Sequence, residues 1–398
     1  ANWHSAHAAV EEDEMQAGMQ DDGELDSDLF APPTDSRFER TEKFCSAAVE
    51  RELRRMQGRH SHGNLTDSEE SQLRFLNELD KSAGPAVDGV RLLTVTYGKR
   101  RAIGRLTASY PALQSCPSAL RPRIAGRFYH DADIVNCHPV LKLQVAEKMG
   151  VETPKLREYV SDRSEMLQRI ADHYGVTPQK AKYAVLRVLN LGGIEKWIKD
   201  SECIRGQYEC QLDLRELQEE ARVVMDSFFE MDQFKAHVAE MTKDMETSTA
   251  AKVRAATERY QAAAANAKVD AKQALDEAKR KATPIAIQRS VFAGCCFELE
   301  DSVLEVVDCH LQEKGWTVAT LIYDGLLVEV RPGADLEAVL REAETAVKQK
   351  LDYKIALMEK PLFTKPMGGR AQEDQPPLEE PPGEQAQEDQ AMSEEPQA

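Results

Sequence analysis

A long stretch without glycine or proline limits the folds open to this chain more than any other feature. It runs from Gln207 to Thr283 and is rich in alanine, glutamate, lysine and arginine. These residues favour helices, and the residues that end helices are missing, so the stretch predicts long helices. Its later half, Ala250 to Lys281, has little hydrophobic stripe. We therefore expect an insertion that projects from the body, and it is a candidate arm for binding a protein partner.

The segments on either side of these helices alternate between strand and helix patterns. Apolar runs meet at Asp324-Gly325, a favoured hairpin turn pair. Pro139 and Pro178 are well placed for the first turns of helices. The sequence predicts strands at 91–97, 127–135, 317–330 (two strands) and 353–362, and helices at 41–56, 68–79, 136–149, 177–190, 291–313 and 335–350. This order predicts an α+β fold in which helices cover one face of an antiparallel sheet.

Charge is distributed very unevenly along the chain. The net charge is −18, but residues 1–40 hold eleven acids and two bases, and residues 369–398 hold nine acids and one base, which leaves −1 for residues 41–368. Both ends are poor in large apolar residues and are predicted to be disordered. By contrast, residues 91–127 hold eight bases and no acid. That basic segment is a candidate phosphate-contacting surface.

The eight cysteines form no CxxC pair, and Cys203 with Cys210 is a poor zinc spacing. A reduced, intracellular protein is therefore expected rather than a disulfide scaffold. The sequence has no apolar run long enough for a membrane span and no visible signal peptide at its start.

Two aspartates stand where phosphoryl-transfer chemistry would need them. Asp133 lies near the end of one predicted strand and Asp324 at the tip of the predicted hairpin. Two divalent ions about 4 Å apart can hold the attacking and leaving oxygens of such a reaction, and carboxylates on adjacent strands can hold the ions. An aspartate at a hairpin is, however, usually turn chemistry. Asp131 shares a strand face with Asp133, so periodicity alone does not separate the two.

Four short motifs, in order, resemble the family A (DNA polymerase I-like) DNA polymerases, which are related to phage-type single-subunit RNA polymerases. The second motif of that family is a helix with a nucleotide-binding lysine, and the third is an aspartate on a hairpin. The similar segments here are Ile103 to Ser109 with Pro111, Gln114 and Arg121; Asp133 to His138; Lys182-Tyr183 through Gly193; and Tyr323 to Glu329.

The resemblance implies a right-hand polymerase palm with helical fingers, acting on a primer–template and nucleoside triphosphates. Asp133 and Asp324, with the Ile134 carbonyl, would bind two Mg²⁺ ions. Lys182 would meet the triphosphate, and His138 stands where the family carries the residue that excludes ribonucleotides. Arg105, Gln114 and Arg121 would contact the nucleic acid. We favour Asp133 over Asp131 because its spacing to His138 matches the family motif.

The resemblance also divides the chain. The expected parts are an acidic arm (1–40), a helical region that would at most form a reduced thumb (41–90), the first part of the palm with the fingers helix (91–206), the helical insertion (207–283), the second part of the palm (284–366) and an acidic tail (367–398).

The chain departs from the family pattern at two motifs. Pro178 replaces an arginine expected before Lys182, and Tyr323 replaces a histidine. Three alternatives therefore stay open. They are a single-subunit RNA polymerase or primer-making enzyme, an inactive palm that only binds nucleic acid, and a helical scaffold.

Overall fold

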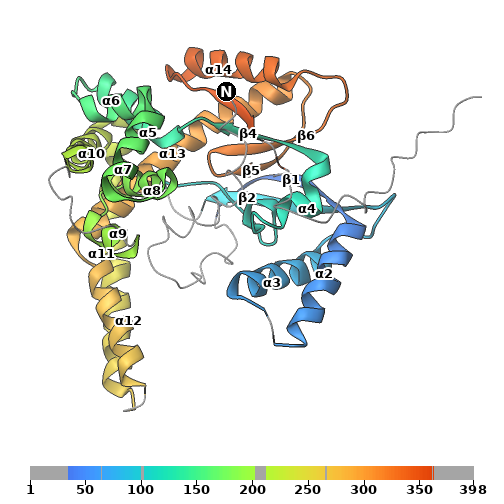
Figure 1. Ribbon diagram of the computed structural model, residues 1–398, viewed down its shortest axis with the longest axis horizontal. Coiled ribbons are helices and arrows are strands. Elements are labelled where there is room, and N and C mark those ends of the chain that lie inside the picture. Colours follow the sequence, from blue (N-terminus) through green and yellow to red (C-terminus); the bar gives the residue numbers. More distant parts are fainter. Residues whose placement is uncertain are drawn as a thin grey trace, which may run out of the picture.

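The computed structural model describes residues 35–63, 65–99, 103–201, 212–264, 267–360 and 362. Most of the two acidic ends, and Arg100 and Arg101 of the basic segment, lie outside these residues. The described part is an α+β structure with two antiparallel sheets, and its helices lie mainly to one side of them (Figure 1).

The first sheet begins earlier than the sequence predicts. Strand β1 (Asp35–Cys45) pairs with β2 (Val90–Lys99), and β2 pairs with the short β3 (Thr107–Ala108). The prediction of a disordered arm to residue 40 and a helix from Thr41 is therefore wrong at residues 35–45. The charges of Arg40 and Glu42 on the inward face conceal the alternating pattern of this strand.

Two helices and several short turns complete this part of the molecule. Helix α3 begins with a capping box between Thr66 and Glu69, a signature that predicts a helix start. The elements are α2 (Ser46–His60), α3 (Asp67–Ser82), the 3₁₀ turns η2 (Leu113–Ser115) and η3 (Gly126–Phe128), and α4 (Arg121–Ala125).

The second sheet has four strands in the order β5-β6-β4-β7, with every neighbouring pair antiparallel. The chain runs from β4 through helices to the β5–β6 hairpin, then through one helix to β7, which is the split β-α-β arrangement. The first and third of these strands are therefore central. The bounds are β4 (Tyr129–Ile134), β5 (Val318–Ile322), β6 (Gly325–Glu329) and β7 (Leu357–Lys360).

Two long helices pack against this sheet. Helix α13 is apolar over most of its length and contacts both β5 and α5, whereas α14 contacts α13 and β7 (Figure 1). Asp335 caps α14 by accepting a hydrogen bond from Ala338 N, as the sequence predicts. The bounds are α5 (Cys137–Lys148), α13 (Pro284–Glu313) and α14 (Leu336–Leu351).

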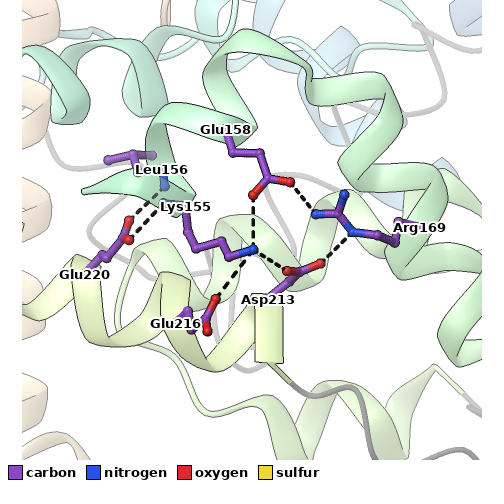
Figure 2. Close-up of polar contacts among 7 residues, drawn as sticks. All are labelled: Lys155, Leu156, Glu158, Arg169, Asp213, Glu216 and Glu220. Atoms are coloured by element: carbon purple, nitrogen blue, oxygen red, sulfur yellow. Dashed lines mark hydrogen bonds and ion pairs between the residues drawn. The ribbon is translucent and has the colours of Figure 1, made fainter. Parts of the chain in front are cut away.

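A helical bundle follows α5. Its members are α6 (Pro154–Ser161), α7 (Arg163–Tyr174), α8 (Pro178–Leu189), α9 (Ile194–Asp200) and α10 (Leu212–Glu230). Glu220 of α10 accepts hydrogen bonds from the backbone N–H groups of Lys155 and Leu156, both at 2.8 Å, and so satisfies the first turn of α6. Figure 2 shows the ion pairs that continue this contact, made by Lys155, Glu158, Arg169, Asp213 and Glu216.

Only the later part of the glycine-free stretch projects. Helix α10 packs on α5, α6 and α8 with Leu217 and Phe228 fully buried, so it belongs to the bundle. Helix α11 (Asp232–Ala262) starts beside α13, and its distal half forms an arm with α12 (Lys268–Lys281) that extends away from both sheets (Figure 1). Within the described residues, no helix is long and apolar enough to cross a membrane.

The two sheets meet along the outer edge of β5. Leu321 N donates to the Tyr97 hydroxyl at 3.1 Å, and Leu321 O accepts from Gln114 Nε2 at 2.9 Å. Beside them Glu42, fully buried, accepts from Leu113 N at 2.7 Å and from the Thr320 hydroxyl at 2.8 Å. Polar side chains of the first sheet and of η2 thus take the place of a further strand.

Glu42 makes this junction sensitive to pH. Burial raises the pKa of its carboxyl to about 8, from an ordinary value of 4.5, although the two hydrogen bonds oppose the shift. The folded protein therefore holds a proton that the unfolded chain releases, so stability falls as pH rises between these two values. One such group contributes at most about 1.4 kcal/mol per pH unit.

Glu42→Gln is expected to remove this contribution. The free energy of unfolding, measured by urea denaturation from pH 5 to 8, should fall less steeply with pH in the variant than in the wild type. Other buried acids titrate in both proteins, so the difference in slope isolates Glu42. Parallel slopes would show that Glu42 is ionised in the folded state.

Candidate active site

The β5–β6 hairpin brings Asp324 beside Asp133. Asp133 is paired in register with Gly325, and Ile134 N donates to the backbone oxygen of Asp324 at 2.9 Å. The residues of the turn are Tyr323 and Asp324, and Gly325 already belongs to β6. Gly325 is required by close approach, because a Cβ there would lie 2.7 Å from Ala132 O and 2.9 Å from Asp133 Oδ1.

The two carboxyls share one electrostatic environment. Burial raises the pKa of Asp133 well above its usual value, and the neighbouring charge of Asp324 raises it further. Lys360 opposes this shift, with Nζ 2.5 Å from Asp133 Oδ2. Burial also raises the pKa of Asp324, and Glu300 is the largest charge acting in the same direction. Two acids held together against their own repulsion favour a positive charge nearby, and Lys360 supplies one.

Glu300, on α13, is the site residue that sequence reasoning missed. Its side chain is fully buried, and its carboxylate receives Arg105 Nε at 2.8 Å and a second Arg105 nitrogen at 3.0 Å. His138 Nε2 lies 2.6 Å from Glu300 Oε2. Burial alone would raise the pKa of Glu300, but Arg105 and His138 outweigh it, so the pKa is lowered. Glu300 therefore ties two predicted site residues together beside the aspartates.

Arg105 lies against two aromatic rings. Its guanidinium lies 4.3 Å from the ring centre of Phe297 and 4.7 Å from that of Tyr323. Tyr323 has a φ of +53°, in the left-handed region that non-glycine residues rarely adopt. Such backbone strain often marks functional sites. The stacked Arg105 thus supports the turn that presents Asp324.

Acidic side chains of α13 bind Lys99, Gly104 and Leu106 of the basic segment. Glu298 pairs with the buried Lys99 and accepts from Gly104 N, and Asp301 accepts from Leu106 N at 2.7 Å. The positive charges at Lys99 and Arg105 are therefore partly neutralised within the protein. For these two bases the structure thus shows partners inside the protein.

Gln114 and Arg121 are also used inside the fold. Gln114 accepts from Ala108 N and donates to Leu106 O and Leu321 O. Arg121 is buried and donates to the backbone oxygens of Leu113 and Cys116. Contact of Arg105, Gln114 and Arg121 with nucleic acid stays a prediction, and in this structure each has partners within the protein.

Lys182 lies half-buried on α8, in the helical bundle and not on the sheet. The end of α8 is fastened to α5, because the buried Lys142 donates to Leu189 O at 2.9 Å and to Asn190 Oδ1 at 2.8 Å. Gly192 lies in the tight turn after α8, where a Cβ would sit 2.5 Å from Arg187 Cγ. Helix α5, which follows Asp133, thus packs against the end of α8, the helix that carries Lys182.

The donor set suits a hard divalent cation. Asp133 and Asp324 offer carboxylate oxygens, which Mg²⁺ prefers, and burial together with the neighbouring acids raises the pKa of both. Lys360 supplies part of the missing positive charge. Among the described residues, no three His, Cys, Asp or Glu side chains form a ready metal cluster. The two carboxylates are the oxygen donors that this pair offers, and the Ile134 carbonyl as a further ligand stays a prediction.

Comparison with known proteins gives one distant likeness. No family model matches the chain. A protein of the Sputnik virophage named "Putative helicase V13" is 27% identical over 254 residues, which are 64% of this chain and 27% of that protein. The match thus spans about a quarter of the relative's length.

Proposed function

We propose that the chain is a template-directed nucleotidyltransferase of the DNA polymerase type. The observation that carries the proposal is the meeting of Asp133, on β4, with Asp324, in the turn before the neighbouring antiparallel strand β6, in a split β-α-β sheet. The motifs that resemble family A polymerases name these same two residues. The virophage relative, named a helicase, supports an enzyme that acts on nucleic acid.

Helicase activity is not part of the proposal. The match covers only a quarter of that relative. In addition, the only Gly-Lys pair of this sequence, Gly98-Lys99, is followed by arginine, so it contains no P-loop of the form GxxxxGK[ST]. The unwinding suggested by that name therefore has no support in these residues.

Each residue has a role in the proposed reaction. Asp133 and Asp324, with the Ile134 carbonyl, would hold two Mg²⁺ ions, whose chemistry is to neutralise charge at the attacking 3′ oxygen and the leaving pyrophosphate. Lys182 would meet the triphosphate, and His138 would lie under the sugar. Arg105 keeps the Asp324 turn in place through Tyr323 and holds Glu300. An inactive nucleic-acid-binding palm is the alternative that an activity assay excludes.

His138 is expected to select the sugar. Its Nε2 is engaged by Glu300 and its ring lies 5.5 Å from that of Phe297, so the imidazole is held in place. A fixed ring under the 2′ position would reject ribonucleotides by steric clash, and we expect wild type to prefer dNTPs and His138→Ala to gain NTP incorporation. The measurement is kcat/KM for a dNTP and its matching NTP in primer extension.

The opposite result would identify an RNA-making enzyme. With Nε2 engaged, Nδ1 is the ring atom left to hydrogen-bond a 2′ hydroxyl. A wild type that prefers NTPs, and that loses this preference in His138→Ala, would mean that His138 reads the hydroxyl.

A further inference from the structure

The arm formed by the distal half of α11 and by α12 carries a charge opposite to that of the chain. Residues 250–283 contain eight basic and four acidic residues, a net of +4, in a chain of net −18. All eight basic side chains are exposed. The arm extends away from both sheets (Figure 1), so this positive charge stands apart from the acids of α13 that neutralise the basic segment.

Three lysines form a stripe on α12. Lys268, Lys272 and Lys279 follow each other at spacings of four and seven residues, which places them on one helical face over about 16 Å. By the same periodicity Asp270 falls on another face, whereas Asp276, four residues after Lys272 and three before Lys279, shares the face of the lysines. That face of α12 therefore carries three exposed ammonium groups and one carboxylate, and its charge is positive.

The surroundings of the stripe suit a phosphate backbone better than a lipid surface. Leu275 is buried, and α12 packs against α11. In the described part of residues 250–283, Val269 is the large apolar side chain that is exposed. A helix that lies in a membrane interface needs a broad exposed apolar face, which this arm does not offer. Binding to the stripe would be electrostatic.

We propose that the lysine stripe of α12 binds the backbone of a nucleic-acid strand. Phosphates follow one another at about 3.4 Å along a strand, so about 16 Å of stripe matches about five of them. The surface lies outside the candidate active site, and binding there needs neither Asp133 nor Asp324. It would hold substrate, or a neighbouring stretch of it, at a distance from the aspartates.

The test is the salt dependence of oligonucleotide binding by the full chain. We compare wild type with a variant carrying Lys268→Gln, Lys272→Gln and Lys279→Gln, using fluorescence anisotropy of a labelled single-stranded DNA between 50 and 200 mM salt. Losing three phosphate contacts should make the slope of log Kd against log salt shallower by about 2 for single strands. The substitutions are on exposed positions, so the fold should be unchanged, as circular dichroism can verify.

A matched control carries the same charge change elsewhere, as Lys81→Gln, Lys348→Gln and Lys350→Gln on α3 and α14. Its slope should stay near that of wild type. An unchanged slope for the α12 variant, or an equal loss in the control, overturns the proposal. So does an α12 variant that loses binding to phosphatidylserine vesicles, or to a peptide of residues 369–398, while keeping its DNA affinity. The readout is binding and does not require catalysis. A wild type without polymerase activity would therefore refute the proposed function, but it would not affect the interpretation of the binding result.

Discussion

Asp324→Asn is expected to abolish nucleotide addition while leaving the protein folded. If the proposed function is right, the variant loses an anionic metal ligand, and the charge stabilisation at stake is several kcal/mol. At about 1.4 kcal/mol per tenfold, the rate should fall on the order of 10³-fold. Asparagine has nearly the same shape and carries no charge to repel Glu300. Since burial raises the pKa of Asp324, the neutral variant should be at least as stable as wild type.

The comparison with Asp131 makes this result specific. Asp131→Asn changes a carboxylate on the same strand face as Asp133, two residues away, and should extend a primer at close to the wild-type rate. Asp133→Asn should lose activity as Asp324→Asn does. Single-turnover extension with Mg²⁺ measures all three. Activity that survives in Asp324→Asn, or vanishes in Asp131→Asn, would show that the pair has been assigned wrongly.

Glu300→Ala is expected to destabilise the protein by about 3–5 kcal/mol. The variant leaves the largely buried Arg105 guanidinium without its carboxylate and removes the partner of His138. Urea denaturation measures the loss. Adding Arg105→Met to Glu300→Ala should restore part of it, because the uncompensated charge is then gone.

Glu305→Ala, at an exposed position of the same helix, is the control and should change stability by less than about 0.5 kcal/mol. If Glu300→Ala behaves like Glu305→Ala, the network around Arg105 does not stabilise the fold.

The aspartate pair could be predicted from sequence because each member follows a local pattern. Asp133 ends an apolar strand and Asp324 sits at a hairpin, and the helix after Pro139 and the cap at Asp335 also follow local rules. The resemblance to family A polymerases then predicted that Asp133 and Asp324 lie in one site, which local patterns cannot predict. The sequence alone did not show which charged side chains are buried.

Buried charged residues explain why the sequence analysis missed β1 and Glu300. Arg40 and Glu42 interrupt the apolar face of β1, and their partners Asp308 and Thr320 are more than 260 residues away in sequence. Glu300 lies in an otherwise apolar helix, and its partner Arg105 is 195 residues away in sequence. A signal was present, because three acids at 298–301 in an apolar helix require cations nearby.

The junction at β5 also determines whether the second sheet can be separated from the first. An open strand edge is a template for pairing with other molecules, and here Tyr97 and Gln114 occupy the backbone groups that would recruit such a partner. A fragment that begins after the first sheet would keep both aspartates and Gln114 but lose Tyr97, so Leu321 N at this edge would have no partner. We therefore expect the first sheet to protect the edge of the second from pairing with other copies of the chain.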